Sequence, residues 1–165
     1  MEALTAGTSA PDFTLNSTDG KPFSLKEAFA RGPVVAAFFK ISCPVCQYAL
    51  PFLERVYKSK GKSNVTFVGI SQDNLRDTRI FMEEFGITFP VLLDDTTTYP
   101  VSNAYQLTNV PSIFWIAQDG EIEISSVGWS RKDVEKIHRK VVKEAGTKPL
   151  PLFQPGEDVR DFRAG

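Results

Sequence analysis

The feature that most constrains the fold of this 165-residue chain is the junction between an apolar run and an amphipathic segment. Residues 34–39 are all apolar, and so short a run is typical of a strand buried on both faces of a sheet. Residues 44–59 follow with apolar side chains at helical spacing. That stripe consists of Val45, Ala49, Phe52, Leu53 and Val56. The pattern predicts a central strand that turns directly into a helix.

The two cysteines of the chain, Cys43 and Cys46, lie at this junction and are separated by Pro44 and Val45. The first turn of a helix has unpaired N–H groups and a partial positive charge, which together stabilise a thiolate. Pro44 suits this turn because its missing N–H costs nothing there. We therefore predict that Cys43 ionises more easily than a free cysteine and acts as the nucleophile. Cys46, about one helical turn further on, is placed to resolve the mixed disulfide.

The rest of the chain alternates between strand and helix patterns, which indicates parallel strands joined by crossovers. In order, we expect a hairpin around residues 17–20, a helix at 26–30, a strand at 65–71, a helix at 75–85, a strand at 89–93, a helix at 100–105, an antiparallel hairpin of 113–116 and 121–127, and a helix from Ser130 to Gly146. Ile80, Phe81 and Phe85 are expected to face inward. The predicted fold class is α/β, with a mixed central sheet, helices on both faces and an N-terminal β-hairpin.

The chain is predicted to divide into one domain, residues 1–146, and a proline-rich tail, residues 147–165. A single domain is the default at this length. The tail has no hydrophobic periodicity and cannot form a core of its own. Phe153 and Phe162 are expected to hold it on the domain surface, with a dimer arm or a loose end as the alternatives.

Composition excludes several classes of partner. The 19 basic residues nearly balance the 20 acidic ones and are scattered, so no nucleic-acid footprint is expected. No apolar stretch approaches the roughly 18 residues of a membrane span, and no signal peptide is recognisable. These features predict a cytoplasmic protein without a membrane partner, and a cytosolic cysteine pair is more often catalytic than structural.

No metal site and no cofactor are predicted. Structural zinc needs four ligands, usually cysteine or histidine, and this chain offers two cysteines and the distant His138. His138 falls on an apolar helical stripe, which favours a core or boundary position over a catalytic one.

Three segments in this order resemble the thioredoxin superfamily, in the redoxin branch that includes AhpC/TSA peroxiredoxins and TlpA-like thiol-disulfide oxidoreductases. The first is the Cys-Pro-Val-Cys motif at 43–46, followed by Pro51. The second is Ala-Pro-Asp-Phe-Thr-Leu at 10–15, and the third is Val-Pro-Ser-Ile-Phe at 110–114. The resemblance spans about residues 10–146 and implies a thioredoxin-like fold with a redox-active disulfide.

The third segment resembles the superfamily's cis-proline loop. This implies a cis peptide bond before Pro111, although the base rate for any X–Pro bond favours trans. Val110 would then expose its backbone for pairing with an extended substrate. The implied partners are protein or small-molecule disulfides and thiols, together with a cellular dithiol reductant.

Four neighbours of the thiols are candidates for tuning them. Pro44 and Val45 lie between the cysteines and influence the reduction potential. Lys40 could lower the pKa of Cys43 through its positive charge, although solvated lysine is the more ordinary interpretation. Ser42 could cap the helix. The proton acceptor for Cys46 is left open.

A thiol-disulfide oxidoreductase is the leading prediction, and two alternatives remain. One is a peroxiredoxin-like antioxidant enzyme that reduces hydroperoxides through a sulfenic acid. That family pattern places threonine or serine three residues before the reactive cysteine and proline seven before, where this chain has Lys40 and Ala36. Its arginine after the proline loop is replaced by Ser112. The other alternative is a non-catalytic adaptor whose disulfide switches binding.

Overall fold

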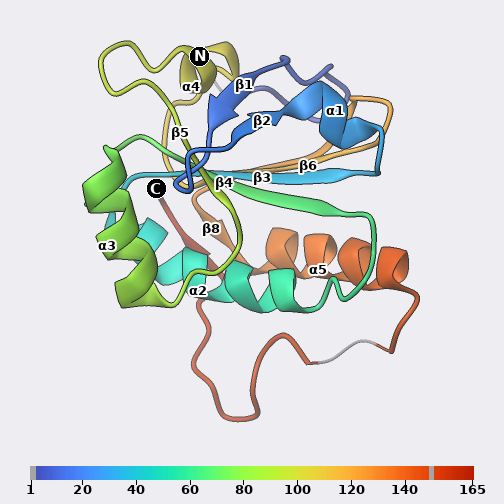
Figure 1. Ribbon diagram of the computed structural model, residues 1–165. Helices are drawn as coiled ribbons and strands as arrows, with labels where there is room; N and C mark the ends of the chain where they lie inside the picture. Colours follow the sequence, from blue (N-terminus) through green and yellow to red (C-terminus); the bar gives the residue numbers. More distant parts are fainter. Residues whose placement is uncertain (1–2, 149–150) are drawn as a thin grey trace.

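The computed structural model describes residues 3–148 and 151–165, and its centre is a mixed five-stranded sheet (Figure 1). The strand order is β5-β4-β3-β6-β7. The strands are β3 (Val34–Phe39), β4 (Thr66–Ser71), β5 (Val91–Leu93), β6 (Ser112–Ile116) and β7 (Ile122–Val127). β3 and β5 each run parallel to β4, whereas β6 runs antiparallel to both β3 and β7.

Helices cover both faces of this sheet, as Figure 1 shows. One face carries α2 (Pro44–Lys58), α3 (Leu75–Phe85) and α5 (Arg131–Ala145). The other carries α1 (Leu25–Phe29), α4 (Pro100–Ala104) and the antiparallel hairpin of β1 (Thr14–Asn16) with β2 (Pro22–Ser24). The predicted fold class, including the N-terminal hairpin, is confirmed.

Strand β3 is the structural centre because every one of its side chains is fully buried. Val35, Ala37 and Phe39 pack into the core under α2 and α5, and the alternate residues pack into the core under α1 and α4. A strand with two apolar faces can occupy only an interior position, which brings its carboxyl end, and hence the cysteines, to the middle of the sheet edge.

Polar side chains cap the N-termini of two helices. Asn74 and Ser130 accept hydrogen bonds from the N–H groups of Asp77 and Asp133, and thereby begin α3 and α5. Both helices end at a glycine with positive φ, the conformation in which glycine has no steric penalty.

Two details of the prediction are wrong. Ile80 was expected to face inward but is 52% exposed, because the buried stripe of α3 runs instead through Thr78 and Phe81. The strand expected at 89–93 begins only at Val91. The N–H of Phe89 donates to the carboxylate of Glu54 and is therefore taken out of the strand ladder.

Glu54 fixes helix α2 to the segment before β5. Its side chain is buried, and its carboxylate accepts hydrogen bonds from the N–H and hydroxyl of Thr88 and from the N–H of Phe89. Buried backbone donors are costly to leave unpaired, so this carboxylate holds α2 in register with the sheet.

We expect Glu54→Ala to destabilise the fold by about 2–4 kcal/mol, because two backbone donors and a hydroxyl lose their acceptor. The measurement is the free energy of unfolding from chemical denaturation. Glu83→Ala, at an exposed position of α3, is the matched control and should change stability by less than about 0.5 kcal/mol. Equal losses for the two variants would refute the role of Glu54.

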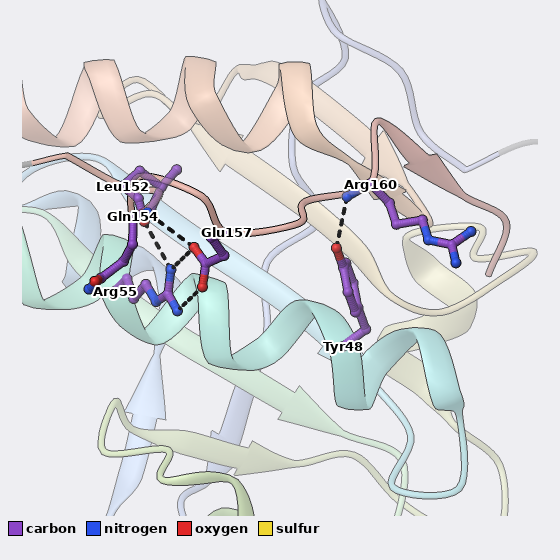
Figure 2. Close-up of polar contacts among 6 residues, drawn as sticks. All are labelled: Tyr48, Arg55, Leu152, Gln154, Glu157 and Arg160. Atoms are coloured by element: carbon purple, nitrogen blue, oxygen red, sulfur yellow. Dashed lines mark hydrogen bonds and ion pairs between the residues drawn. The ribbon is translucent and has the colours of Figure 1, made fainter.

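The segment that follows α5 packs along α2 (Figure 2). Leu152 is buried, and Phe153 lies edge-on to Phe52 with ring centroids 5.5 Å apart. Phe162 is 63% exposed, so the expectation that it pins the tail is wrong. At that point the backbone holds the tail instead, through the pairing of β9 (Phe162–Arg163) with β8 (Trp129–Ser130). The domain boundary at residue 146 stays a prediction, and the tail's Pro149 lies outside the described residues.

Within residues 3–148 and 151–165, no helix combines the length and the hydropathy that crossing a membrane requires.

Candidate active site

The carboxyl end of β3, the first turn of α2 and the loop before β6 meet at one place. Cys43 is the N-cap residue of α2, and its Sγ accepts a hydrogen bond from the N–H of Cys46 at 3.3 Å. Pro44 occupies the first helical position, where no N–H is needed. The sulfur of Cys43 therefore performs the capping function that a serine or aspartate oxygen usually performs.

The two sulfurs lie in different surroundings. Cys43 is partly exposed, whereas Cys46 is fully buried, and both are free thiols. Burial raises the pKa of the Cys46 thiol far above its usual range, and the adjacent Cys43 and the negative charge of Asp73 act in the same direction. Cys46 is consequently protonated at neutral pH, and Cys43 is the sulfur that solvent can reach.

The loop before β6 borders Cys43. The Val110–Pro111 peptide bond is cis, which confirms the expected isomer. The thiol of Cys43 donates to the carbonyl of Val110 at an Sγ–O distance of 3.5 Å. Two hydrogen bonds hold the loop: Ser112 Oγ donates to the Asn109 carbonyl at 2.7 Å, and the Gly128 N–H donates to the Pro111 carbonyl at 2.8 Å.

Residues 40–42 link β3 to the helix. Lys40 and Ser42 are exposed, and the predicted capping role of Ser42 is wrong because the helix begins one residue later, with Cys43 as the cap. Two hydrogen bonds hold the backbone of Ile41. Its N–H donates to the Asp73 carboxylate at 2.8 Å, and its carbonyl accepts from the Gln47 side-chain amide at 2.9 Å.

Asp73 is a site residue that the sequence analysis did not identify. It follows β4, and because β4 runs parallel to β3, the two strands end at the same edge of the sheet. Its carboxylate therefore lies under the loop that carries Cys43, where it orients Ile41 and acts electrostatically on Cys46. The topological rule for parallel strands was the signal that could have found it.

His138 takes no part in this site. It is buried on the apolar stripe of α5, and its ring lies 3.2 Å from the hydroxyl of Ser59. Ser59 caps the C-terminal end of α2, roughly 24 Å along the helix from Cys43. Burial lowers the pKa of His138, which keeps the ring neutral at physiological pH.

A profile described as the AhpC/TSA family matches residues 6–125 of the chain. The chain belongs to the AhpC/TSA family. This match spans the hairpin, the motif with its two cysteines and the proline loop, and it ends within β7.

Two relatives carry the same printed name, thiol-disulfide oxidoreductase ResA. That of Geobacillus thermodenitrificans is 28% identical over 142 residues, which cover 86% of this chain and 80% of the relative. That of Bacillus subtilis is 30% identical over 125 residues, which cover 73% and 66%. This AhpC/TSA chain is accordingly an oxidoreductase enzyme, as predicted.

The fold also matches solved structures. The thioredoxin domain of a thiol-disulfide oxidoreductase from Bacteroides vulgatus superposes with a TM-score of 0.74 at 23% identity, covering 85% of this chain and 99% of that one. The thioredoxin-like architecture predicted from the three sequence segments is confirmed.

The different burial of the two cysteines predicts selective alkylation. With iodoacetamide at neutral pH, Cys43 should react at least about tenfold faster than Cys46, because only the thiol of Cys43 is reachable and the pKa of Cys46 is raised by burial. Peptide mapping of the modified protein checks this, and unfolding in denaturant is the control that should equalise the two rates. Faster modification of Cys46 in the folded chain would contradict the assignment.

Proposed function

We propose that this enzyme is a thiol-disulfide oxidoreductase that works through a Cys43–Cys46 dithiol relay. The observation that carries the proposal is the position of Cys43 Sγ, which caps α2 through the Cys46 N–H and also lies beside the carbonyl of Val110. A sulfur held at a helix N-terminus, next to a second thiol and a half-buried loop residue, Val110, has the arrangement that thiol-disulfide exchange requires. The names of the relatives support the same chemistry.

The proposed reaction has two steps. The Cys43 thiolate attacks a substrate disulfide, forms a mixed disulfide and releases one substrate thiolate, which takes up a proton. Cys46 then loses its proton and attacks Cys43 Sγ, which closes the internal disulfide and releases the second substrate thiol. Two electrons pass to the substrate, and a cellular dithiol reductant returns them to the enzyme.

The burial of Cys46 sets the order of these steps. A protonated, inaccessible thiol cannot compete with Cys43 for the substrate. Once Cys43 is part of a mixed disulfide, its sulfur is the electrophile nearest to Cys46 along the first helical turn. Cys46 therefore acts as the resolving cysteine and not as a second nucleophile toward substrate.

The substrates proposed are protein or small-molecule disulfides. The loop at Val110 and Pro111 would receive the backbone of an extended substrate beside Cys43. Lys40, Pro44 and Val45 remain candidates for tuning the potential, and the cytoplasmic location stays a prediction.

Peroxide reduction is the less favoured chemistry. The positions that peroxiredoxins fill with threonine or serine and with proline are here an exposed lysine, Lys40, and a fully buried strand residue, Ala36. Neither offers a hydroxyl to a bound peroxide. The discriminating measurement is steady-state peroxide consumption with a dithiol reductant, and a rate no better than that of small thiols would eliminate the peroxidase.

The relay predicts that replacing Cys43 by serine and replacing Cys46 by serine have different effects. Cys43→Ser should lower disulfide reductase activity by on the order of a thousandfold or more, because no nucleophile remains. Cys46→Ser should keep the first step and accumulate a mixed disulfide with substrate, visible as a mass adduct on Cys43. An adduct on Cys46 in Cys43→Ser, or turnover retained by both variants, would disprove the relay. Cellular function that both substitutions leave untouched would instead favour the non-catalytic adaptor.

A further inference from the structure

Residues 157–165, which we term the strap, run from the middle of α2 to the proline loop (Figures 1 and 2). Upstream of the strap, buried Leu152 and the contact of Phe153 with Phe52 hold the chain firmly on the core. The strap itself is attached by polar contacts that are exposed or only partly buried, and Val159 is its partly buried apolar side chain that packs against the core. The strap is therefore a peripheral segment, and the residues just before it, Leu152 and Phe153, are fixed to the core.

The first attachments lie on α2. Glu157 pairs with Arg55 through both carboxylate oxygens at 2.7 Å, and the backbone N–H of Arg160 donates to the Tyr48 hydroxyl at 2.9 Å (Figure 2). The guanidinium of Arg163 stacks over the ring of Tyr48, 4.9 Å from its centroid. The ion pair is partly exposed on both sides, so salt screens it.

The next attachment is backbone pairing. Strand β9 pairs with β8 over two residues only, and the indole N–H of Trp129 donates to the carbonyl of Arg160 at 2.6 Å. The approach is close at Gly128: a Cβ there would lie 2.5 Å from the carbonyl oxygen of Arg163. A two-residue ladder is weak by itself, so the strap can detach without unfolding the domain.

The far end of the strap reaches the active site. The side-chain amide of Asn109 donates to the carbonyl of Gly165 at 3.0 Å. A Cβ on Gly165 would collide with the carbonyl oxygen of Val110, so the strap touches this carbonyl. The same oxygen lies 3.5 Å from Cys43 Sγ. The carbonyl of Val110 in the proline loop is therefore in contact with both the strap and the sulfur of Cys43.

We propose that the strap is a displaceable gate that admits small disulfides to Cys43 and excludes polypeptide disulfides until it moves. The inference deepens the function proposed above and rests on it. An extended polypeptide that pairs beside Val110 needs the space that the Gly165 end of the strap occupies. A small disulfide needs only the exposed part of Cys43, which the strap leaves open. The apparent affinity for polypeptides is therefore the affinity of the open state multiplied by the fraction of time that the strap is open.

The gate is not a pH switch near neutrality. Arg55 lowers the pKa of Glu157 to about 2. A carboxylate with a lowered pKa contributes its attachment fully above the ordinary value of about 4.5, and the contribution disappears only as the pH falls toward about 2. Ionic strength is the variable that loosens this anchor.

The test compares the parent chain with Glu157→Gln/Arg163→Ala, which removes the ion pair and the stacking on Tyr48. The loosened variant should reduce insulin about fivefold to tenfold faster in kcat/KM, whereas hydroxyethyl disulfide should be reduced within about twofold of the parent rate. Glu123→Gln is the matched control. It weakens the remote ion pair with Lys140 and should change neither rate.

A second measurement does not depend on enzymatic turnover. The rate of alkylation of Cys43 by a polymer-linked maleimide, divided by the rate with iodoacetamide, should rise in the loosened variant and not in the control. An unchanged ratio together with an unchanged insulin rate overturns the gate. A raised ratio in a chain that reduces neither disulfide supports the gate and instead disproves the proposed function.

Gly165→Ala keeps the test decisive if the double variant does not fold. This substitution places a Cβ against the Val110 carbonyl and perturbs the strap only at its far end. It should raise the maleimide-to-iodoacetamide ratio in the same direction. A lower ratio would mean that the strap forms part of the binding surface for bulky reagents, which is the opposite of a gate.

Discussion

The contact between Cys43 Sγ and the Cys46 N–H is the interaction on which the chemistry depends. It makes the nucleophile the N-cap of a helix, so the group that must carry negative charge also satisfies an otherwise unpaired donor. It also fixes the distance between the cysteines to one helical turn. Cys43, as the cap, is partly exposed, whereas Cys46 lies among the core-facing residues of α2.

This geometry follows from the burial of β3. A strand with apolar residues on both faces takes an interior place in the sheet, between a parallel neighbour, β4, and an antiparallel one, β6. Parallel pairing brings the end of β4, with Asp73, beneath the cysteine loop. Antiparallel pairing brings the start of β6, with the proline loop, beside Cys43. The directions of β4 and β6 thus bring Asp73 and the proline loop to the cysteines, although these segments are distant in sequence.

Much of this was predictable because the signals are local. The apolar run, the cap residues and the closing glycines each act within a few residues, and the resemblance supplied the proline loop and the sheet topology. The predictions that failed depended on distant partners. The start of β5 is set by Glu54, 35 residues away from Phe89, and the exposure of Ile80 by how α3 rests on its neighbours. Asp73 required the strand order before its place in the site could be recognised.

The strap lay beyond sequence reasoning for the same reason. Its composition indicated only a segment without a core, and its hydrophobic Phe162 pointed to an anchor that the structure does not use. The strap is held by single polar contacts to α2, by the pairing of β9 with β8 at Trp129 and by the packing of Val159 on the core. Such contacts have no periodicity and leave no pattern in the chain.

Helix α2 connects these features, because two adjacent residues attach it in opposite ways. Glu54 faces the interior and binds buried backbone donors, whereas Arg55 faces outward and binds Glu157 through a partly exposed ion pair. Successive helical residues point about 100° apart, so one helix can be fixed to the sheet on one side and hold a releasable segment on the other. Movement of the strap therefore separates Glu157 from Arg55 and Arg160 from Tyr48, while the hydrogen bonds of Glu54 are unaffected. The N-terminal cap at Cys43 keeps its geometry while access to it changes.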